Sequence, residues 1–142
     1  MNGNTELLNF IYQNAQMGIE TISQLLDIIE DKEFKERLNL QLTEYKVAND
    51  NAKKLLNDNG HDEKGISAFE KLRAYLMINM QTLTDKSSSH VAEMLIIGSN
   101  MGVIQAIKKL KRYRDAEKNI LSLMDKLLKT EENNIVELKK FL

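Results

Sequence analysis

Apolar side chains recur at alternating steps of three and four positions along most of this 142-residue chain. That spacing is the repeat of an amphipathic α-helix, in which about 3.6 residues make one turn. It predicts five helices, over residues 5–30, 32–58, 66–84, 87–114 and 116–142. Proline is absent and glycine occurs only six times, so almost nothing interrupts these helices. The sequence therefore predicts an all-α protein.

The most apolar segment, residues 87–114, is predicted to be the central helix. At about 100° per residue its apolar side chains fall into two stripes on opposite sides. The first stripe is Leu95, Ile96, Val103, Ala106, Ile107 and Leu110, and the second is Met94, Ile97, Met101 and Ile104. A surface helix needs one apolar stripe, so two opposed stripes predict protein on both sides. The second stripe is a candidate interface, covered either by the short helix of the crossover or by a second copy of the chain.

Two aspartates mark helix starts that follow very short joins. Asp31 is the predicted N-cap of the second helix, and Asp115 is the predicted N-cap of the last. Short joins place consecutive helices antiparallel, so residues 5–58 and 87–142 are predicted to form two helical hairpins. A weak internal repeat, NAQMGI from Asn14 and GSNMGV from Gly98, supports this division, because it has the same offset of 84 as the two aspartates.

The segment between the hairpins, residues 59–86, is predicted to be a long crossover. Each long helix spans roughly 40 Å at 1.5 Å per residue, and the short helix within the crossover can cover most of that length. Such a crossover lets the second and fourth helices run parallel. The prediction for residues 1–142 is a single domain, a ferritin-like up-down-down-up four-helix bundle with an extra helix in the crossover.

The composition of the chain limits which partners and which cellular compartment we expect. The 20 basic and 21 acidic side chains give a net charge of −1 and are spread along the chain, so no basic face for nucleic acid stands out. Cysteine is absent, which excludes disulfides and thiolate metal sites. The N-terminus lacks a secretory signal pattern, and no apolar run approaches the ~20 residues that span a bilayer. We expect a soluble cytoplasmic protein without a nucleic-acid or membrane partner.

The last helix contains a recognisable motif. Residues 131–140 read EENNIVELKK, which resembles the last helix of ferritin-like and rubrerythrin-like proteins, where the pattern is Glu-x-x-His-Ile-x-x-Leu-Lys. With NAQMGIE from Asn14 and DKSSSHVAEMLIIGSNMG from Asp85, the chain resembles a family of small ferritin-like proteins from Gram-positive anaerobes. The resemblance covers most of the chain and implies the bundle fold, but it implies no particular activity.

The resemblance also implies where a di-iron site would lie. Such a site takes a Glu from each of two helices and a Glu-x-x-His from each of the other two. Glu131 matches the Glu of the last helix, but Asn134 stands at the His position. Glu44 is the candidate for the second copy, with Val47 at its His position. Amide and valine side chains do not replace imidazole for iron. The motif is therefore degenerate, and iron or manganese held by Glu131 and Glu44 is the alternative prediction.

Glu131 is the most informative single residue. It lies on the apolar seam between Leu128 and Ile135, where an ionised carboxylate is costly unless it is paired or hydrogen-bonded. It can bond other inward polar groups and fix helix register, hold a metal or small ligand, or reach solvent near the bundle end. The candidate polar core site is Glu131, Asn134, Glu44, Asn14, Asn49 and Tyr45, with Gln41 and Ser99 as further candidate partners.

These features favour a non-enzymatic structural or protein-interaction module, a homodimer without a cofactor. The alternative is a metal-binding oxidoreductase or metal-storage protein that uses iron or manganese. A third hypothesis is a ligand-binding bundle, which predicts a defined cavity beside Glu131. No phosphate-binding loop, nucleophile elbow or other catalytic motif is present to indicate a substrate.

Overall fold

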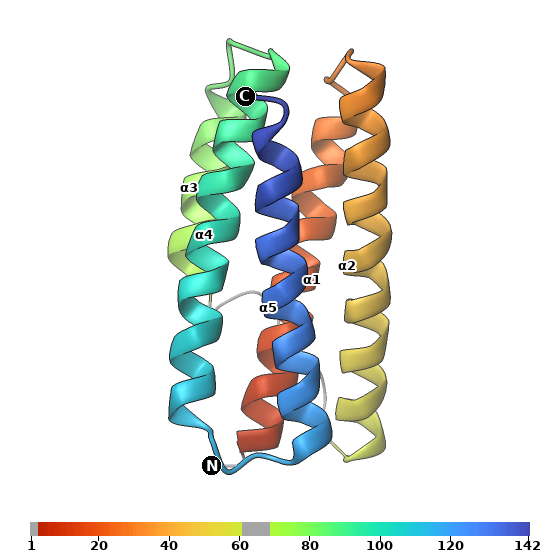
Figure 1. Ribbon diagram of the computed structural model, residues 1–142, viewed down its shortest axis with the longest axis vertical. Coiled ribbons are helices and arrows are strands. Elements are labelled where there is room, and N and C mark those ends of the chain that lie inside the picture. The colour runs from red at the N-terminus through yellow and green to blue at the C-terminus, as the bar shows by residue number, and fades with distance from the viewer. Residues whose placement is uncertain (1–2, 61–68) are drawn as a thin grey trace.

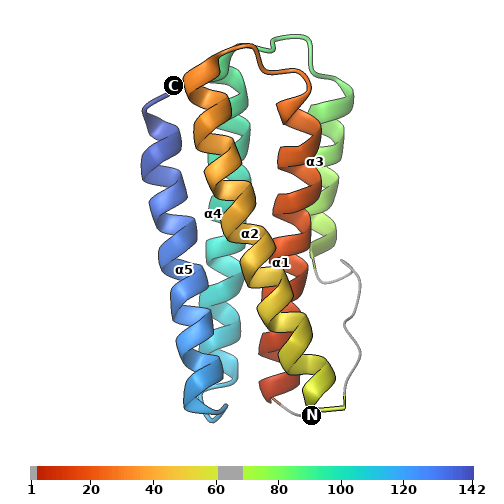
Figure 2. The ribbon, with the colours of Figure 1, turned by 90° about the vertical axis from the view of Figure 1, so that its right-hand side faces the viewer.

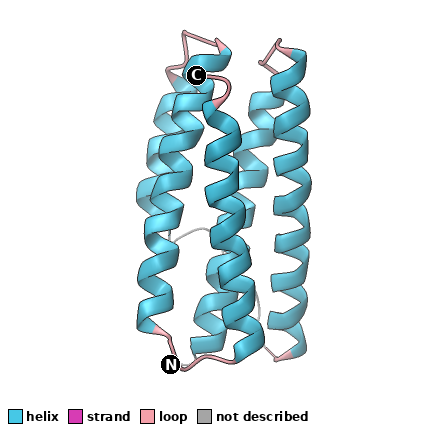
Figure 3. Cartoon of the chain, viewed as in Figure 1, coloured by secondary structure: helices cyan, strands magenta, loops and turns pink. Residues whose placement is uncertain are grey.

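The computed structural model describes residues 3–60 and 69–142, which form five helices. They are α1 (Gly3–Leu26), α2 (Lys32–Asp58), α3 (Glu70–Gln81), α4 (Ser88–Arg112) and α5 (Lys118–Lys139). No strand occurs in these two ranges (Figure 3). The prediction of an all-α protein is confirmed.

Helix bounds differ from the predicted ones mainly at the ends. The first helix stops at Leu26 rather than at residue 30. After Leu26 the chain forms a turn, in which the backbone N–H groups of Ile28 and Ile29 donate to the carbonyl oxygen of Leu25. Ile29 is nevertheless buried, so the apolar repeat continued past the helix itself. α3 ends at Gln81 rather than residue 84, and its predicted start at residue 66 lies outside the described residues.

The long helices form two antiparallel pairs, α1 with α2 and α4 with α5 (Figure 1). In that view α1 rises from the end marked N, α2 and α4 descend, and α5 rises to the end marked C. α2 and α4 therefore run in the same direction. Between α2 and α4 in the chain, α3 rises along the bundle and packs against α4 (Figure 1). The view turned by 90° draws α3 next to α1, with α4 behind α2 (Figure 2).

The core lies along the seams that the apolar repeat marks. In α1 the buried seam includes Leu8, Ile11, Ala15, Ile22 and Leu25. Aromatic pairs bridge separate elements of the bundle. Phe34 of α2 stacks on Phe141 just after α5, with ring centroids 4.7 Å apart, and Phe10 of α1 meets Phe69 before α3 at 4.9 Å. Burial of these side chains is the main stabilising term.

One of the two predicted caps is correct. Asp31 caps α2, since its Oδ1 accepts the backbone N–H of Phe34 at 2.8 Å. The prediction for Asp115 is wrong, because the N-cap of α5 is Glu117, which makes no side-chain cap bond. The first backbone N–H of this turn, that of Glu117, instead donates to Oδ1 of Asn4 at 2.8 Å. An asparagine from the start of α1 thus supplies the acceptor that a local aspartate was expected to supply.

The face that α4 buries is centred on its glycines. Gly98 and Gly102 are buried together with Met94 and Leu95. A Cβ at Gly98 would lie 3.4 Å from Cδ2 of Leu76, so α3 packs closely against α4 there. Small residues at the centre let the helices approach, and the larger apolar residues flank them.

Only part of the second apolar stripe of α4 is buried in the bundle. Met94 is buried and Met101 is half-buried, whereas Ile97 is 41% exposed and Ile104 is 52% exposed. The crossover helix therefore leaves Ile97 and Ile104 uncovered. The first stripe is not fully buried either, since Ile107 is 38% exposed. Cover by a second copy stays a prediction.

α4 is also the one described helix that is long and apolar enough to cross a membrane. Within its most apolar 18-residue window 33% of the residues are buried in the bundle. The central helix of a bundle can be as long and as apolar as a membrane-spanning helix. Length and composition therefore do not decide which of the two α4 is.

Candidate functional site

Glu131 lies in the middle of α5 and is only 2% exposed. The helical repeat turns it inward together with its apolar neighbours on the same face. Its Oε1 accepts a hydrogen bond from the hydroxyl of Tyr45 on α2. Asn14 of α1 and Ser99 of α4 also donate side-chain hydrogen bonds to the carboxylate. One acidic group is thus bonded to each of the other three long helices.

Burial and hydrogen bonding act on this acid in opposite directions. Burial raises the pKa of Glu131 above its usual value, because a low-dielectric environment disfavours the charged form. The hydrogen bonds from Tyr45, Ser99 and Asn14 lower the pKa, but they do not cancel the effect of burial. The pKa of Tyr45 is raised well above its usual value, first by burial and then by the Glu131 charge. The Tyr45 hydroxyl therefore keeps its proton and acts as a donor.

Two glycines make room for the groups that reach Glu131. A Cβ at Gly18 of α1 would lie 2.5 Å from Cδ2 of Tyr45, so the tyrosine ring rests directly on the α1 backbone. A Cβ at Gly102 of α4 would lie 3.1 Å from Oδ1 of Asn14. A Cβ at Gly18 would push the Tyr45 ring from its place beside the acid, whereas a Cβ at Gly102 would require Asn14 to shift by only a few tenths of an ångström.

Two amides extend the polar cluster. Gln41 is 3% exposed and Asn134 is 1% exposed, and the Asn134 amide lies beside the Tyr45 hydroxyl. Among the described residues, no hydrogen-bond partner of normal geometry reaches Nε2 of Gln41 or Nδ2 of Asn134. Buried polar groups are rarely left unpaired in folded proteins. The protein's own groups therefore satisfy this cluster incompletely.

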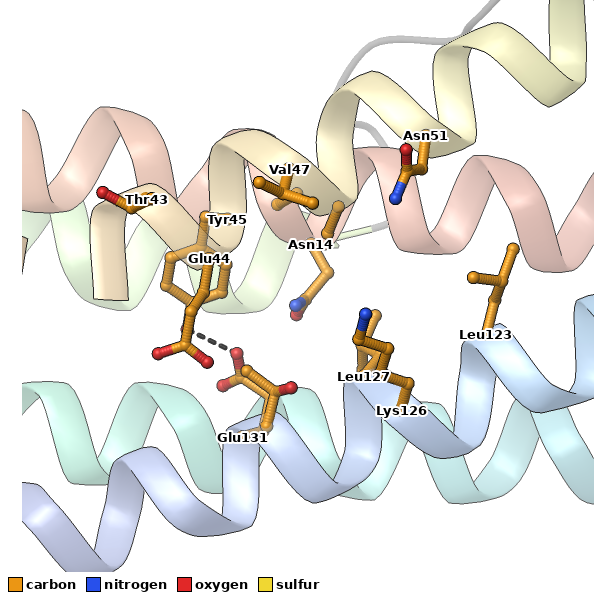
Figure 4. Close-up of a pocket in the computed structure, with 13 residues that line it drawn as sticks. Asn14, Thr43, Glu44, Tyr45, Val47, Asn51, Leu123, Lys126, Leu127 and Glu131 are labelled. Atoms are coloured by element: carbon orange, nitrogen blue, oxygen red, sulfur yellow. Dashed lines mark hydrogen bonds between the residues drawn. The ribbon is translucent and has the colours of Figure 1, made fainter. Parts of the chain in front are cut away.

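A cleft of about 230 Å³ opens between α2 and α5 and ends at this acid (Figure 4). Its walls are mostly aliphatic and include Ala48, Leu123 and Leu127. Asn14, Tyr45 and Glu131 converge on its inner end from three different helices. A smaller hollow of about 40 Å³ meets the same three residues from the side of α3. Glu131 thus belongs to the lining of both hollows.

The structure divides the candidate polar core residues into two groups. Asn14, Tyr45, Glu131 and Asn134 are buried together in the cluster just described. Glu44 is exposed and lines the cleft, and burial of part of its side chain raises its pKa despite the nearby Arg37 charge.

Asn49 lies apart from the acid. It is half-buried, and its Nδ2 donates to the backbone oxygen of Tyr12 and to Oε1 of Gln16, each at 3.3 Å. It therefore ties α2 to α1 rather than contributing to the cluster around Glu131.

Within residues 3–60 and 69–142, the carboxylates do not gather into a set of metal ligands. In the described parts of the chain, no group of three or more His, Cys, Asp or Glu side chains could hold a metal ion. Glu44 and Glu131 line the same cleft, where the other polar groups are hydroxyls, amides and the ammonium of Lys126. Iron and manganese sites in proteins usually include imidazole or several carboxylates. A metal bound by Glu44 and Glu131 stays an alternative hypothesis.

The apolar walls of the cleft were not predicted from the sequence. Ala48, Leu123 and Leu127 read as ordinary seam or flank residues, and they line a cavity only because α2 and α5 diverge (Figure 2). Gln41, named from the sequence as a candidate partner of Glu131, is buried one turn before Tyr45 on the same face of α2 and lines the smaller hollow with Glu131. The spacing of four was the available signal.

No protein-family model, curated protein or solved structure matches this chain. The geometry of the cleft and of its buried acid is therefore what bears on function.

Proposed function

We propose that this protein is a non-enzymatic, ferritin-like bundle that binds a small organic molecule in the cleft between α2 and α5. The ferritin-like assignment is supported by the directions of the long helices, with α2 and α4 parallel and a crossover between them (Figure 1). The EENNIVELKK motif supports the assignment further, because its first glutamate, Glu131, is buried inside the bundle.

The observation that carries the binding function is a cleft of about 230 Å³ ending at a buried carboxylate. Ligand sites are concave and mostly apolar, with a few polar groups that converge to orient the ligand, and in bundles they lie between helices. The cleft has aliphatic walls and converging polar groups from Asn14, Tyr45 and Glu131. A closed hydrogen-bond network that served only to fix helix register would need no cleft.

The Tyr45 hydroxyl serves this site as a fixed hydrogen-bond donor. Its pKa lies well above its usual value, so the hydroxyl keeps its proton at neutral pH and holds Glu131 in place.

The test is a fragment screen followed by NMR chemical-shift mapping on the full chain. We expect shifts at cleft residues such as Ala48 and Leu123, and loss of those shifts in Ala48→Leu, which fills the cleft. Ala74→Leu makes the same change at an exposed site on α3 and is the matched control. If no fragment at millimolar concentration shifts the cleft residues, the proposed binding function is wrong.

A second candidate function is self-association through α4. Ile97 and Ile104 are seven residues apart on one helix face, and both are exposed, with half-buried Met101 between them. Contiguous exposed apolar side chains mark interaction surfaces. We expect a homodimer by size-exclusion chromatography with light scattering, and a monomer for the double variant Ile97→Glu, Ile104→Glu. A wild-type monomer at high micromolar concentration would count against this function.

A further inference from the structure

The inner end of the cleft presents an acceptor and is partly open to a new donor. A carboxylate has about four lone-pair sites for hydrogen bonds. The Tyr45 hydroxyl occupies one of those on Glu131, and the side chains of Ser99 and Asn14 also stabilise its charge. Glu131 is only 2% exposed but lines the inner end of the cleft, which is where a donor on a ligand would meet it.

A second acid stands along the same approach. Glu44 lines the cleft one position before Tyr45, and its side chain points toward the same space as Glu131 (Figure 4). Its charge also raises the pKa of Glu131, by less than burial does, because like charges repel. A positive charge between them would relieve that repulsion, because each acid would then face an opposite charge.

Lys126 is the basic residue among the described ones that line the cleft, and it does not neutralise these acids. Lys126 lines the cleft from α5, but it is exposed, and within the described chain it forms no ion pair with Glu44 or Glu131. Its side chain extends into the space between α2 and α5 (Figure 4), and its flexible stem lets the ammonium turn out to water when a ligand enters. The inner part of the cleft therefore favours a cation over an anion.

The walls limit the size and character of the rest of the ligand. A cavity of about 150 Å³ lined by aliphatic and aromatic side chains accepts benzene. At about 230 Å³ this cleft accommodates one ring and a short arm, about ten non-hydrogen atoms. Leu123, Leu127 and Ala48 offer apolar contact to such a body.

Building on the proposed binding function, we propose that the ligand is a small primary amine with a compact apolar body. Its ammonium group bonds Glu131 at the inner end with Glu44 beside it, and its apolar part lies against Leu123 and Leu127. Charge-assisted hydrogen bonds to a buried carboxylate are about twice as strong as neutral ones, which gives the site its selectivity for an amine.

The experiment compares three probes that share a phenyl ring and differ in the polar group, namely phenethylamine, phenethyl alcohol and phenylacetate. Affinities are measured on the full chain by NMR titration at neutral pH. We expect phenethylamine to bind at least about tenfold more tightly than phenethyl alcohol, with phenylacetate weakest. Glu131→Gln is expected to abolish this preference, and Glu132→Gln, at the exposed next residue, is expected to keep it.

The outcomes separate this inference from the proposed function. Binding of the alcohol or of phenylacetate as tightly as the amine would overturn the amine assignment and leave the binding function standing. If none of the three probes binds and the fragment screen also fails, the binding function itself is wrong. Should Glu131→Gln fail to fold, Glu44→Gln at an exposed position gives the second test, with an expected severalfold loss of amine affinity. Unchanged amine affinity in that variant would contradict the proposed role of Glu44.

Discussion

The hydroxyl of Tyr45 on α2 donates a hydrogen bond to Oε1 of Glu131 on α5, 86 residues further along the chain. This bond crosses the bundle at the inner end of the cleft that separates the two helices. Both residues are less than 10% exposed, so the bond is shielded from water. It holds the buried acid in place where the two helical hairpins face each other.

Tyr45→Phe removes this donor and leaves the acid with one fewer hydrogen bond. We expect a loss of about 1–3 kcal/mol in the free energy of unfolding, the usual cost when a buried polar group loses its partner. Urea denaturation at neutral pH measures it. The control is Tyr75→Phe on α3, a half-buried tyrosine outside the cluster, which should change stability by no more than about 0.5 kcal/mol. Equal effects of the two variants would show that the Tyr45–Glu131 bond contributes little.

The raised pKa of Glu131 predicts a particular pH dependence of stability. In the unfolded chain this group titrates near 4.5, and in the folded chain it titrates at higher pH. Between these two values the folded state binds more protons, so the Glu131 contribution to stability falls as pH rises, and then becomes constant. Because Glu131→Gln cannot titrate, the stability of the wild type relative to this variant should decrease as pH rises above about 4.5.

The measurement is the free energy of unfolding of both proteins from about pH 2.5 to pH 8, a range that extends below the unfolded value of 4.5. Glu137→Gln provides a comparison of opposite sign. A hydrogen bond from Lys140, together with the charges of Arg37 and Lys140, lowers the pKa of Glu137. The wild type should therefore lose stability relative to Glu137→Gln as pH falls through that lowered pKa. A pH-independent difference for Glu131→Gln would contradict the raised pKa.

Two glycines on facing helices should respond oppositely to the same substitution. Gly98→Ala places a Cβ at 3.4 Å from the flexible end of Leu76, an ordinary contact, so alanine's helix propensity should stabilise the protein by up to about 1 kcal/mol. Gly18→Ala places a Cβ at 2.5 Å from the Tyr45 ring and should destabilise it by about 1–3 kcal/mol. Thermal unfolding of both variants gives the comparison. A stabilised Gly18→Ala would mean that the Tyr45 ring moves away without cost.

Replacement of Asp31 and of Asp115 by alanine should have different effects on the free energy of unfolding. Asp31→Ala removes the acceptor for the backbone N–H of Phe34 and should cost about 0.5–2 kcal/mol. Asp115→Ala should change stability by less than about 0.5 kcal/mol, because Asp115 does not cap α5. Denaturant unfolding of the two variants measures the difference, and equal losses would show that Asp115 also stabilises its helix.

Much of the candidate site could be anticipated because it depends on helical periodicity. The repeat that buries Leu127 and Ile135 also buries Glu131, and a buried acid must find donors. Asn14, Tyr45 and Ser99 face the same interior for the same reason, so their role as its partners followed from their positions. Asn49 shows the limit of this reasoning. It faces inward too, but it bonds to α1 at 3.3 Å, because the distance between helices decides which groups meet.

The sequence by itself determined the five helices, the inward direction of Glu131 and the cap at Asp31, since each depends on residues within a few turns of one another. Only the tertiary structure decided that Asn4 rather than Asp115 serves the start of α5, and that Gly18 makes room for Tyr45. The cleft was also decided by the tertiary structure, because its volume depends on the angle and separation of α2 and α5. Local repeats specify which face of a helix is buried, whereas side-chain packing across the whole bundle specifies how closely two buried faces approach.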